Sequence, residues 1–455
     1  MTFHGQNILV LGAGISGTGA ARALCRAGAQ VTLSDVRPLS AELTSALTAM
    51  GIRCVFGVQD SPLLAGITQV VVSPGIALTT PIVRLATEAH IPIVAELEIA
   101  YRLAEAPIYA ITGTNGKTTT TTLLGSMFDA AGREYAVGGN IGSALSEDVG
   151  EVSAAGVIVA EVSSFQLETV HAFRPHVAAI LNITPDHFER HGSMDAYVAA
   201  KSRVFENQTA EDILIVNRHD RYCRELANQA NSQLYWVSTQ DIVERGGYVR
   251  DGMLYLRIDD RDIPLVRTDE LQIRGEHNWL NALTAALMAY TGQVPIRVIQ
   301  GVLRVFRGLP HRVERVRQVD RVTYYDDSKA TNPDATVKAL AEFSGHTVWI
   351  AGGHDKQTAI DELMTAARES VCAAVFLGEA AARFAHEATK AGLTEYVMAD
   401  SMDTAVATAK ELAARCGADV VLFSPACSSF DMYRNYRERG RDFKRCVNLL
   451  ESGQS

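Results

Sequence analysis

The stretch IYAITGTNGKTTTT, residues 108 to 121, decides the fold of this chain. An apolar strand enters a loop with two glycines, and a helix is expected to begin at Lys117. Glycines let backbone N–H groups turn toward phosphate oxygens, and the helix N-terminus adds a positive dipole. In such a loop the lysine reaches the terminal phosphates and Thr118 ligates magnesium. The stretch predicts an α/β fold that holds the phosphates of ATP.

The loop departs in one place from the usual phosphate-binding loop. That loop has a glycine five places before the Gly-Lys pair, where this chain has Ile111, and its first glycine is Gly113 instead. A glycine turn that only starts a helix is the alternative. Gly-Lys-Thr after a buried strand favours phosphate binding. The predicted ATP contacts here are Gly113, Thr114, Asn115, Gly116, Lys117, Thr118 and Thr119.

Strands and helices alternate on both sides of this loop, as in βα units of parallel sheets. At 455 residues the chain is long enough for about three domains. We expect an N-terminal Rossmann-like domain at 1–95, a central P-loop domain at 96–308 and a C-terminal Rossmann-like domain at 309–455. A hairpin, GGYVRDGMLYLRI (246–258), interrupts the otherwise parallel plan of the central domain.

Composition excludes several classes of function. The formal net charge is -10, and basic residues are scattered, so no nucleic-acid partner is expected. The seven cysteines show no CxxC pair, which speaks against a zinc site and a disulfide framework. Without a secretory leader or an apolar run of membrane length, we expect a cytoplasmic protein with no membrane insertion. A monomer is the expected state.

A second glycine-rich loop, GAGISG (12–17), follows the first strand, and Asp35 ends the next strand. This spacing matches the dinucleotide fingerprint and, read alone, indicates NAD. The physical requirement is only a diphosphate at a helix N-terminus and an acid near a ribose or base, which other nucleotide diphosphates also meet. A third glycine site, SPGIA (73–77), either helps to hold the same ligand or is a plain turn.

Further polar residues of the central domain are ambiguous. Glu161 and His187 follow strands, where a carboxylate is a conventional magnesium ligand and a histidine an unusual one. His187 alone reads as a loop histidine. Lys201, in an expected helix, reads as an ordinary solvated lysine, and Asn278 as the cap of a helix that begins there.

In the last third, YYDDSKATNPDAT (324–336) crowds Asp327, Ser328 and Lys329 at a strand end. With Arg312 upstream, they indicate a site for phosphate, carboxylate or ribose. Other candidates, for a small anionic substrate, come from GGHDK (352–356) and SPACSSFDMYRNYRERG (424–440). The alternative for the second segment is a helix capped by Ser428 or Ser429 with a solvated, arginine-rich face.

Seven segments stand in one order that resembles the Mur ligase family: TGTNGKTTT, EVSSFQLE, NITPDHFERHG, the Lys201 helix, GEHNWLNA, GLPHRVE and DDSKATNPDA. DSKATN and SPACSSFD resemble the D-glutamate-adding members, and the resemblance covers nearly the whole chain. It implies an ATP-dependent amide ligase of peptidoglycan precursor synthesis. The implied partners are UDP-N-acetylmuramoyl-L-alanine and D-glutamate, with ATP and Mg2+ as cofactors and an acyl phosphate as intermediate.

The resemblance also implies roles for single residues. The implied catalytic residues are Lys117, His187 and Lys201, the last as a carbamylated lysine. The implied metal ligands are Thr118, Glu161, His187 and carbamylated Lys201, and further nucleotide contacts are Asn278, Arg312 and Asp327. The implied UDP-substrate contacts are Gly14, Ser16, Asp35, Arg37, Gly75 and Asn140. The implied D-glutamate contacts are Lys329, Thr331, Lys356, Ser429 and Tyr436. Departures from the family pattern fall at Val36, His354 and Tyr436.

Other readings stay open from the sequence. An NAD-dependent dehydrogenase would use GAGISG, and a non-catalytic nucleotide switch would bind ATP without releasing phosphate in response to substrates. A sibling ligase would add another amino acid. A folylpolyglutamate synthase would leave residues 1–95 without a purpose.

Overall fold

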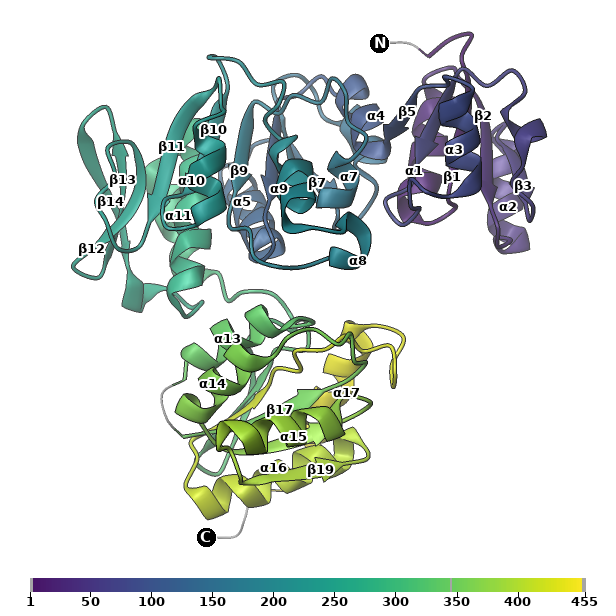
Figure 1. Ribbon diagram of the computed structural model, residues 1–455. Helices are drawn as coiled ribbons and strands as arrows, with labels where there is room; N and C mark the ends of the chain where they lie inside the picture. The colour runs from purple at the N-terminus through teal and green to yellow at the C-terminus, as the bar shows by residue number, and fades with distance from the viewer. Residues whose placement is uncertain (1–2, 344–345, 452–455) are drawn as a thin grey trace. The chain divides into compact units, whose positions relative to one another are not determined.

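A computed structural model describes residues 3–343 and 346–451 of the chain. The ends of the predicted terminal domains, residues 1 and 455, lie outside the described residues. The chain forms two compact units, Met1–Leu271 with Asn278–Phe306, and Gln272–His277 with Arg307–Ser455. Figure 1 shows the first unit in purple to teal and the second in green to yellow. Three sheets with helices between their strands confirm the predicted α/β class.

The N-terminal sheet is fully parallel with β1 at its centre. Its order is β3 (Arg53–Phe56), β2 (Gln30–Asp35), β1 (Asn7–Leu11), β4 (Gln69–Val72) and β5 (Ile93–Ala95). Alternate residues of β1 enter opposite cores, because successive strand side chains point to opposite faces. Ile8 and Val10 pack with α1 (Ile15–Arg26) and α2 (Ala41–Ala49), whereas Leu9 and Leu11 pack with α3 (Pro81–Glu88).

The central sheet has nine strands, and the phosphate loop follows a strand in the middle of the sheet. Its parallel part runs β12 (Gly246–Arg250), β11 (Gln233–Ser238), β10 (Ile213–Asn217), β9 (Val177–Ile180), β6 (Ile108–Thr112), β8 (Val157–Glu161) and β7 (Tyr135–Gly139). The predicted hairpin is confirmed as β12 and β13 (Met253–Ile258), and β14 (Arg261–Arg267) extends it antiparallel. Every residue of β6 is buried, which fixes the start of the loop.

The helices of this unit lie in the connections between strands. None of the described helices combines the length and apolar character that a membrane span requires. Their bounds are α4 (Glu96–Leu103), α5 (Lys117–Ala130), α6 (Leu145–Asp148), α7 (Ser164–Leu167), α8 (Phe188–His191), α9 (Met194–Ser202), α10 (Arg221–Ala227), α11 (Glu276–Thr291) and α12 (Ile296–Val305). Short 3-10 turns are Ser61–Leu64, Val149–Glu151 and Thr268–Glu270.

The N-terminal sheet is joined to the central one through specific contacts inside the first unit. Arg22 on α1 pairs with Glu147 on α6 at 3.1 Å. Gly19 lets the two helices approach, because a Cβ there would lie 2.3 Å from the Cβ of Ala144. The buried carboxylate of Glu98 on α4 accepts the backbone N–H groups of residues 171–173. The first two contacts fix α1 against the central domain, and Glu98 fixes α4, which follows the last N-terminal strand, against residues 171–173.

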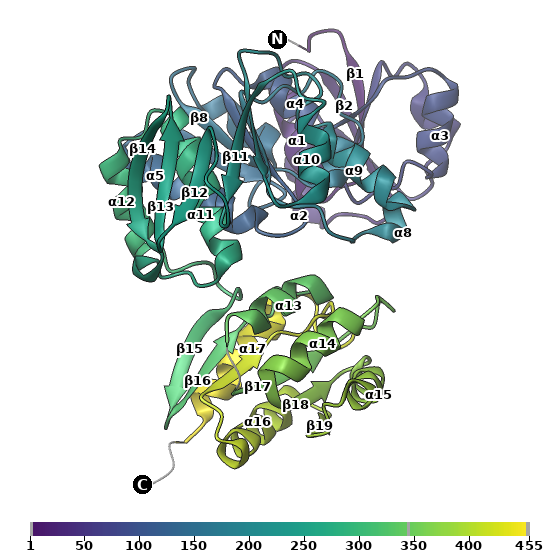
Figure 2. The same cartoon turned by 60° about the vertical axis from the view of Figure 1, so that its left-hand side comes forward.

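The C-terminal sheet is parallel apart from one edge strand. Its order is β15 (Glu314–Val319), β16 (Val322–Asp326), β20 (Val420–Phe423), β17 (Thr347–Gly352), β18 (Val371–Leu377) and β19 (Tyr396–Ala399). Trp349 packs with the helices on one face and Val348 with those on the other. The turned view in Figure 2 labels these helices: α13 (Pro333–Ala341), α14 (Asp361–Ser370) and α15 (Ala381–Ala391) on one face, α16 (Met402–Cys416) and α17 (Tyr436–Leu449) on the other.

Two helix caps that the sequence offered as alternatives to binding roles are not found in the described residues. Helix α11 begins at Glu276, so Asn278 lies inside its first turn and does not cap it. No helix begins at Ser428 or Ser429 within the described residues; α17 is capped by Asn435, whose side chain accepts the N–H of Glu438. Local composition misplaced both starts because the bounds of a helix also depend on the tertiary contacts around it.

Candidate functional site

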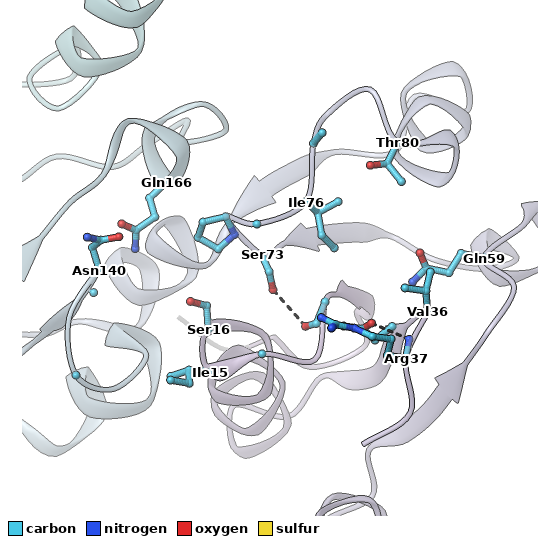
Figure 3. Close-up of a pocket in the computed structure, with 18 residues that line it drawn as sticks. Ile15, Ser16, Val36, Arg37, Gln59, Ser73, Ile76, Thr80, Asn140 and Gln166 are labelled. Atoms are coloured by element: carbon cyan, nitrogen blue, oxygen red, sulfur yellow. Dashed lines mark hydrogen bonds between the residues drawn. The ribbon is translucent and has the colours of Figure 1, made fainter. Parts of the chain in front are cut away.

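A cavity of about 620 Å³ opens at the carboxyl ends of the N-terminal strands. The loops after β1, β2 and β4 line it, and the central domain contributes Asn140 and Gln166 (Figure 3). Ligands of open parallel sheets bind at this edge. The cavity brings together all six residues predicted to contact the UDP substrate: Gly14, Ser16, Asp35, Arg37, Gly75 and Asn140.

The shape of this cavity depends on a close approach of two loops. A Cβ at Gly12, whose φ is +93°, would lie 2.8 Å from Ser73, so only glycine fits. The hydroxyl of Ser73 donates to the carbonyl of Gly12 at 3.2 Å. Asp35 accepts the N–H groups of Ala13 at 2.8 Å and Arg37 at 2.9 Å. The carboxylate of Asp35 therefore holds both flanking loops.

Three polar side chains that line the cavity were missed from the sequence: Gln59, Thr80 and Gln166. Gln166 lies in the EVSSFQLE segment, which was the available signal, and its side chain completes a capping box with Ser163. Gln59 donates to Ser34 at 3.0 Å from a loop that carries no motif. No sequence signal marked Gln59 or Thr80.

The phosphate loop has the geometry that its glycines predict. Gly113 has φ +150° and Gly116 has φ +87°, values at which side chains are strained. The backbone of Asn115 donates to the side chain of Asn182 at 2.8 Å, which anchors the loop tip. Lys117 donates to the carbonyls of Gly113 at 2.8 Å and Thr114 at 2.9 Å. Its ammonium is thus held across the loop, at the N-terminus of α5.

Glu161 ends β8 close to the substrate cavity. One carboxylate oxygen accepts the Asn140 amide at 2.7 Å, and Asn140 itself lines the cavity. The other oxygen is buried and has no hydrogen-bond partner among the residues that the structure describes. A buried carboxylate oxygen without a donor suits a hard cation, since Mg2+ prefers oxygen ligands. The donor set at Glu161 therefore fits the predicted metal.

Lys201 is not the solvated lysine that its local sequence suggested. The residue is only 1% exposed, and its amine donates to the carbonyl of Gly113 at 2.8 Å. Its nitrogen lies 4.6 Å from the centre of the Tyr197 ring. Burial, and then the nearby charge of Lys117, hold the pKa of Lys201 well below its usual range. The amine therefore lies buried directly behind the phosphate loop, where its charged form is less favourable than in water.

His187 lies in the same region with a less fixed environment. Its φ of +55° places it in the left-handed region immediately before α8. The ring is half-exposed and packs on Phe165 with centroids 4.9 Å apart. Asp186 at 3.6 Å and Glu189 at 3.5 Å flank it. Several other described non-glycine residues also have positive φ, so the backbone of His187 alone assigns it no role.

The second unit gathers predicted residues of its own. Asp327 is buried and accepts the Ser424 hydroxyl at 2.7 Å, and burial raises its pKa to about 7. The ammonium of Lys329 lies 4.0 Å from the centre of the Tyr436 ring. This cation–π contact brings together two residues predicted to contact D-glutamate.

The other predicted D-glutamate contacts differ in exposure. A strand bridge between His354 and Ser428 joins the GGHDK and SPACSS segments, which carry Lys356 and Ser429. Lys356 is exposed, Thr331 is partly buried and Ser429 is 2% exposed.

The arginine-rich helix face is not wholly solvated, because Arg439 is buried and donates to the carbonyls of Ser328, Cys427 and Ser428.

Comparisons with known proteins cover nearly the whole chain. Three family models match: "Mur ligase MurD-like, N-terminal domain" at residues 6–95, "Mur ligase middle domain" at 111–289, and "Mur ligase, glutamate ligase domain" at 311–427. A UDP-N-acetylmuramoylalanine--D-glutamate ligase of Pelotomaculum thermopropionicum is 42% identical over 454 residues, 99% of each chain. An enzyme of the same name from Caldanaerobacter subterraneus is 40% identical over 451 residues, 98% of this chain and 99% of the relative.

Solved structures agree on the fold. A pseudomurein peptide ligase type C from Methanothermus fervidus aligns with a TM-score of 0.60 at 18% identity, covering 98% of this chain and 100% of that one. A UDP-N-acetylmuramate-alanine ligase from Thermotoga maritima aligns with a TM-score of 0.58 at 20% identity, covering 97% and 99%. The domain matches and the full-length relatives together show that this chain belongs to the Mur ligase family.

Proposed function

We propose that the protein joins D-glutamate to UDP-N-acetylmuramoyl-L-alanine at the expense of ATP, as a step of peptidoglycan precursor synthesis. The observation that carries this proposal is the hydrogen bond between Asn140 and Glu161. Asn140 lines the nucleotide cavity, and Glu161 offers a free carboxylate oxygen for a metal. The bond supports the proposal because it joins a residue proposed to contact the UDP substrate to a residue proposed to bind magnesium.

An amide does not form efficiently from a free carboxylate, so activation must come first. The alanyl carboxylate attacks the γ-phosphorus of ATP, and the bond to the bridging oxygen breaks, giving ADP and an acyl phosphate. The amine of D-glutamate then attacks the acyl carbon and expels phosphate. Lys117 and the N–H groups of the loop stabilise the charge of the transferred phosphoryl group.

The proposed metal ligands are Thr118, Glu161, His187 and a carbamylated Lys201. Bound magnesium would neutralise phosphate charge there. An amine is a poor ligand for this hard cation, but the neutral amine of Lys201 can add to carbon dioxide and lose a proton. The product is a carbamate, whose two oxygens resemble those of a carboxylate. The depressed pKa of Lys201 supports this role because only the neutral amine reacts.

The remaining site residues are proposed for recognition. The cavity residues Gly14, Ser16, Asp35, Arg37, Gly75 and Asn140 would contact the UDP substrate. Asn278, Arg312 and Asp327 would contact the ATP nucleotide. Lys329, Lys356 and Ser429 supply donors that suit the two carboxylates of D-glutamate, with Thr331 and Tyr436 beside them. Domain limits near 95 and 308, a monomeric state and a cytoplasmic location belong to the same proposal.

Phosphate release tests this function against its rivals. The wild-type protein should release phosphate only when ATP, magnesium, UDP-N-acetylmuramoyl-L-alanine and D-glutamate are all present. A nucleotide switch predicts ATP binding without release in the complete mixture. A dehydrogenase predicts a change in nicotinamide absorbance instead. Phosphate release that is independent of the UDP-sugar would contradict the proposal.

A further inference from the structure

Arg190 connects the central domain to the loop that lines the substrate cavity. It lies on α8, three residues after His187. Its guanidinium donates to the backbone carbonyl of Ile76 at 2.9 Å. Ile76 belongs to the loop 73–77, which follows β4 and lines the cavity that Figure 3 shows. This hydrogen bond joins the two domains beside the cavity.

The guanidinium is held in place by partners on the central domain. The carboxylate of Glu168 accepts hydrogen bonds from two nitrogens of Arg190, Nε at 3.1 Å and Nη2 at 2.6 Å. Both side chains are largely buried, at 15% and 14% exposure. The ring of Phe165 lies 5.2 Å below the guanidinium carbon. Such a paired and stacked arginine has little freedom, so its third contact, to Ile76, has a defined direction.

The loop is held from its other side by the N-terminal domain. Ile76 donates its N–H to the carbonyl of Ser73 at 3.0 Å, which makes a turn. Ser73 in turn donates to Gly12 of the GAGISG loop. The loop therefore lies between Gly12 and Arg190, and losing either contact frees one of its sides.

We propose that Arg190 is a positioning residue for the sugar-nucleotide substrate: it fixes loop 73–77 and so sets the affinity of the cavity. The proposal rests on the proposed function for the identity of the substrate. Arg190 does not line the cavity itself, and it acts through the carbonyl of Ile76. Its effect should fall on the UDP-sugar and leave ATP binding unchanged.

The test compares Arg190→Gln and Arg190→Lys with the wild-type protein. Calorimetry gives the Kd for UDP-N-acetylmuramoyl-L-alanine without ATP, and steady-state rates give KM for each substrate and kcat. Arg190→Gln should weaken UDP-sugar binding about tenfold, the loss expected for a hydrogen bond to a charged group. KM for ATP and kcat should stay within about twofold. Lysine cannot bridge Glu168 and Ile76 together, so Arg190→Lys should rescue only part of the affinity.

Arg22→Gln is the matched control. Arg22 also joins the N-terminal domain to the central domain by an ion pair, with Glu147, but neither residue lines the cavity. The Kd of the Arg22→Gln variant for the UDP-sugar should equal that of the wild-type protein. Equal weakening in both variants would show a general loss of domain contact and would overturn the proposal.

The outcomes separate this proposal from the proposed function. An unchanged Kd in Arg190→Gln would overturn the positioning role even if ligation is normal. Tenfold weaker binding in a protein whose wild type does not ligate D-glutamate would support the role and contradict the function. A wild-type protein that does not bind the UDP-sugar would overturn both.

Discussion

Replacing Glu342 with glutamine should stabilise the protein increasingly as the pH rises. The side chain of Glu342 is 2% exposed and lies 3.3 Å from His277. Burial, and then the charge of Asp327, raise the pKa of Glu342 to about 8, while Arg274 lowers it. Burial lowers the pKa of His277 to about 4, so this histidine does not supply a positive charge at neutral pH.

The magnitude follows from the linkage between protonation and folding. The pKa rises from 4.5 in the unfolded chain to about 8 in the folded protein. At about 1.4 kcal/mol per pKa unit, the free energy of unfolding falls by at most about 5 kcal/mol as the pH rises between these two pKa values. Glu342 is an acid whose pKa is raised by folding. The stability that it contributes is complete below pH 4.5 and is lost as the pH rises through the folded pKa. Glutamine cannot ionise and avoids this loss.

Urea unfolding followed by tryptophan fluorescence measures the effect, since Trp349 is buried in the same unit. Glu342→Gln should match the wild type near pH 4.5 and exceed it by several kcal/mol at pH 9. Glu411→Gln, at an exposed position of α16, is the control and should follow the wild type throughout. A constant difference between Glu342→Gln and wild type across this range would refute the reasoning.

Three further predictions concern the phosphate loop. Lys117→Ala should lower kcat for ATP-dependent ligation by about 100-fold or more, because charge on the transferred phosphoryl group loses its counterion; near-normal turnover would refute the loop assignment. Lys201→Ala should be similarly inactive, and added short carboxylic acids should restore part of the activity if the lysine acts as a carbamate; mass spectrometry of the intact wild type would show the added carbon dioxide. Gly116→Ala should destabilise the protein by at least about 1 kcal/mol through its left-handed backbone alone. Its Cβ would also lie 2.3 Å from Asn281, so KM for ATP should rise; an unchanged KM would contradict the geometry of the loop.

Local sequence predicted the elements whose signals are local. Strand β6 and the start of α5 follow from a buried apolar run that ends at a glycine loop. The hairpin of β12 and β13 follows from its turn residues and alternating pattern. Edge strands such as β14 and β15 were not predicted, because their residues are only partly buried and carry a weak pattern.

In the candidate site, the sequence could not predict the surroundings of residues whose partners lie far away along the chain. Most of the residues proposed for the UDP-sugar lie in segments at the ends of N-terminal strands, where a ligand site is expected. Asn140 follows β7 of the central sheet, and only the family resemblance indicated it. Lys201 could not be recognised as buried, because the groups around it, Gly113 and Tyr197, are brought there only by folding. Glu342 lies in no motif, and Arg190 lies in the NITPDHFERHG segment without a role being predicted for it; the environments of both depend on contacts between segments far apart in sequence.

The most direct measurement of the central claim is the choice of amino acid. Phosphate release and product mass should be followed with ATP, magnesium and UDP-N-acetylmuramoyl-L-alanine, comparing D-glutamate with L-glutamate, L-alanine and L-lysine. The account predicts release with D-glutamate alone and a product heavier by one glutamyl residue. Release with another of these amino acids in place of D-glutamate would contradict it.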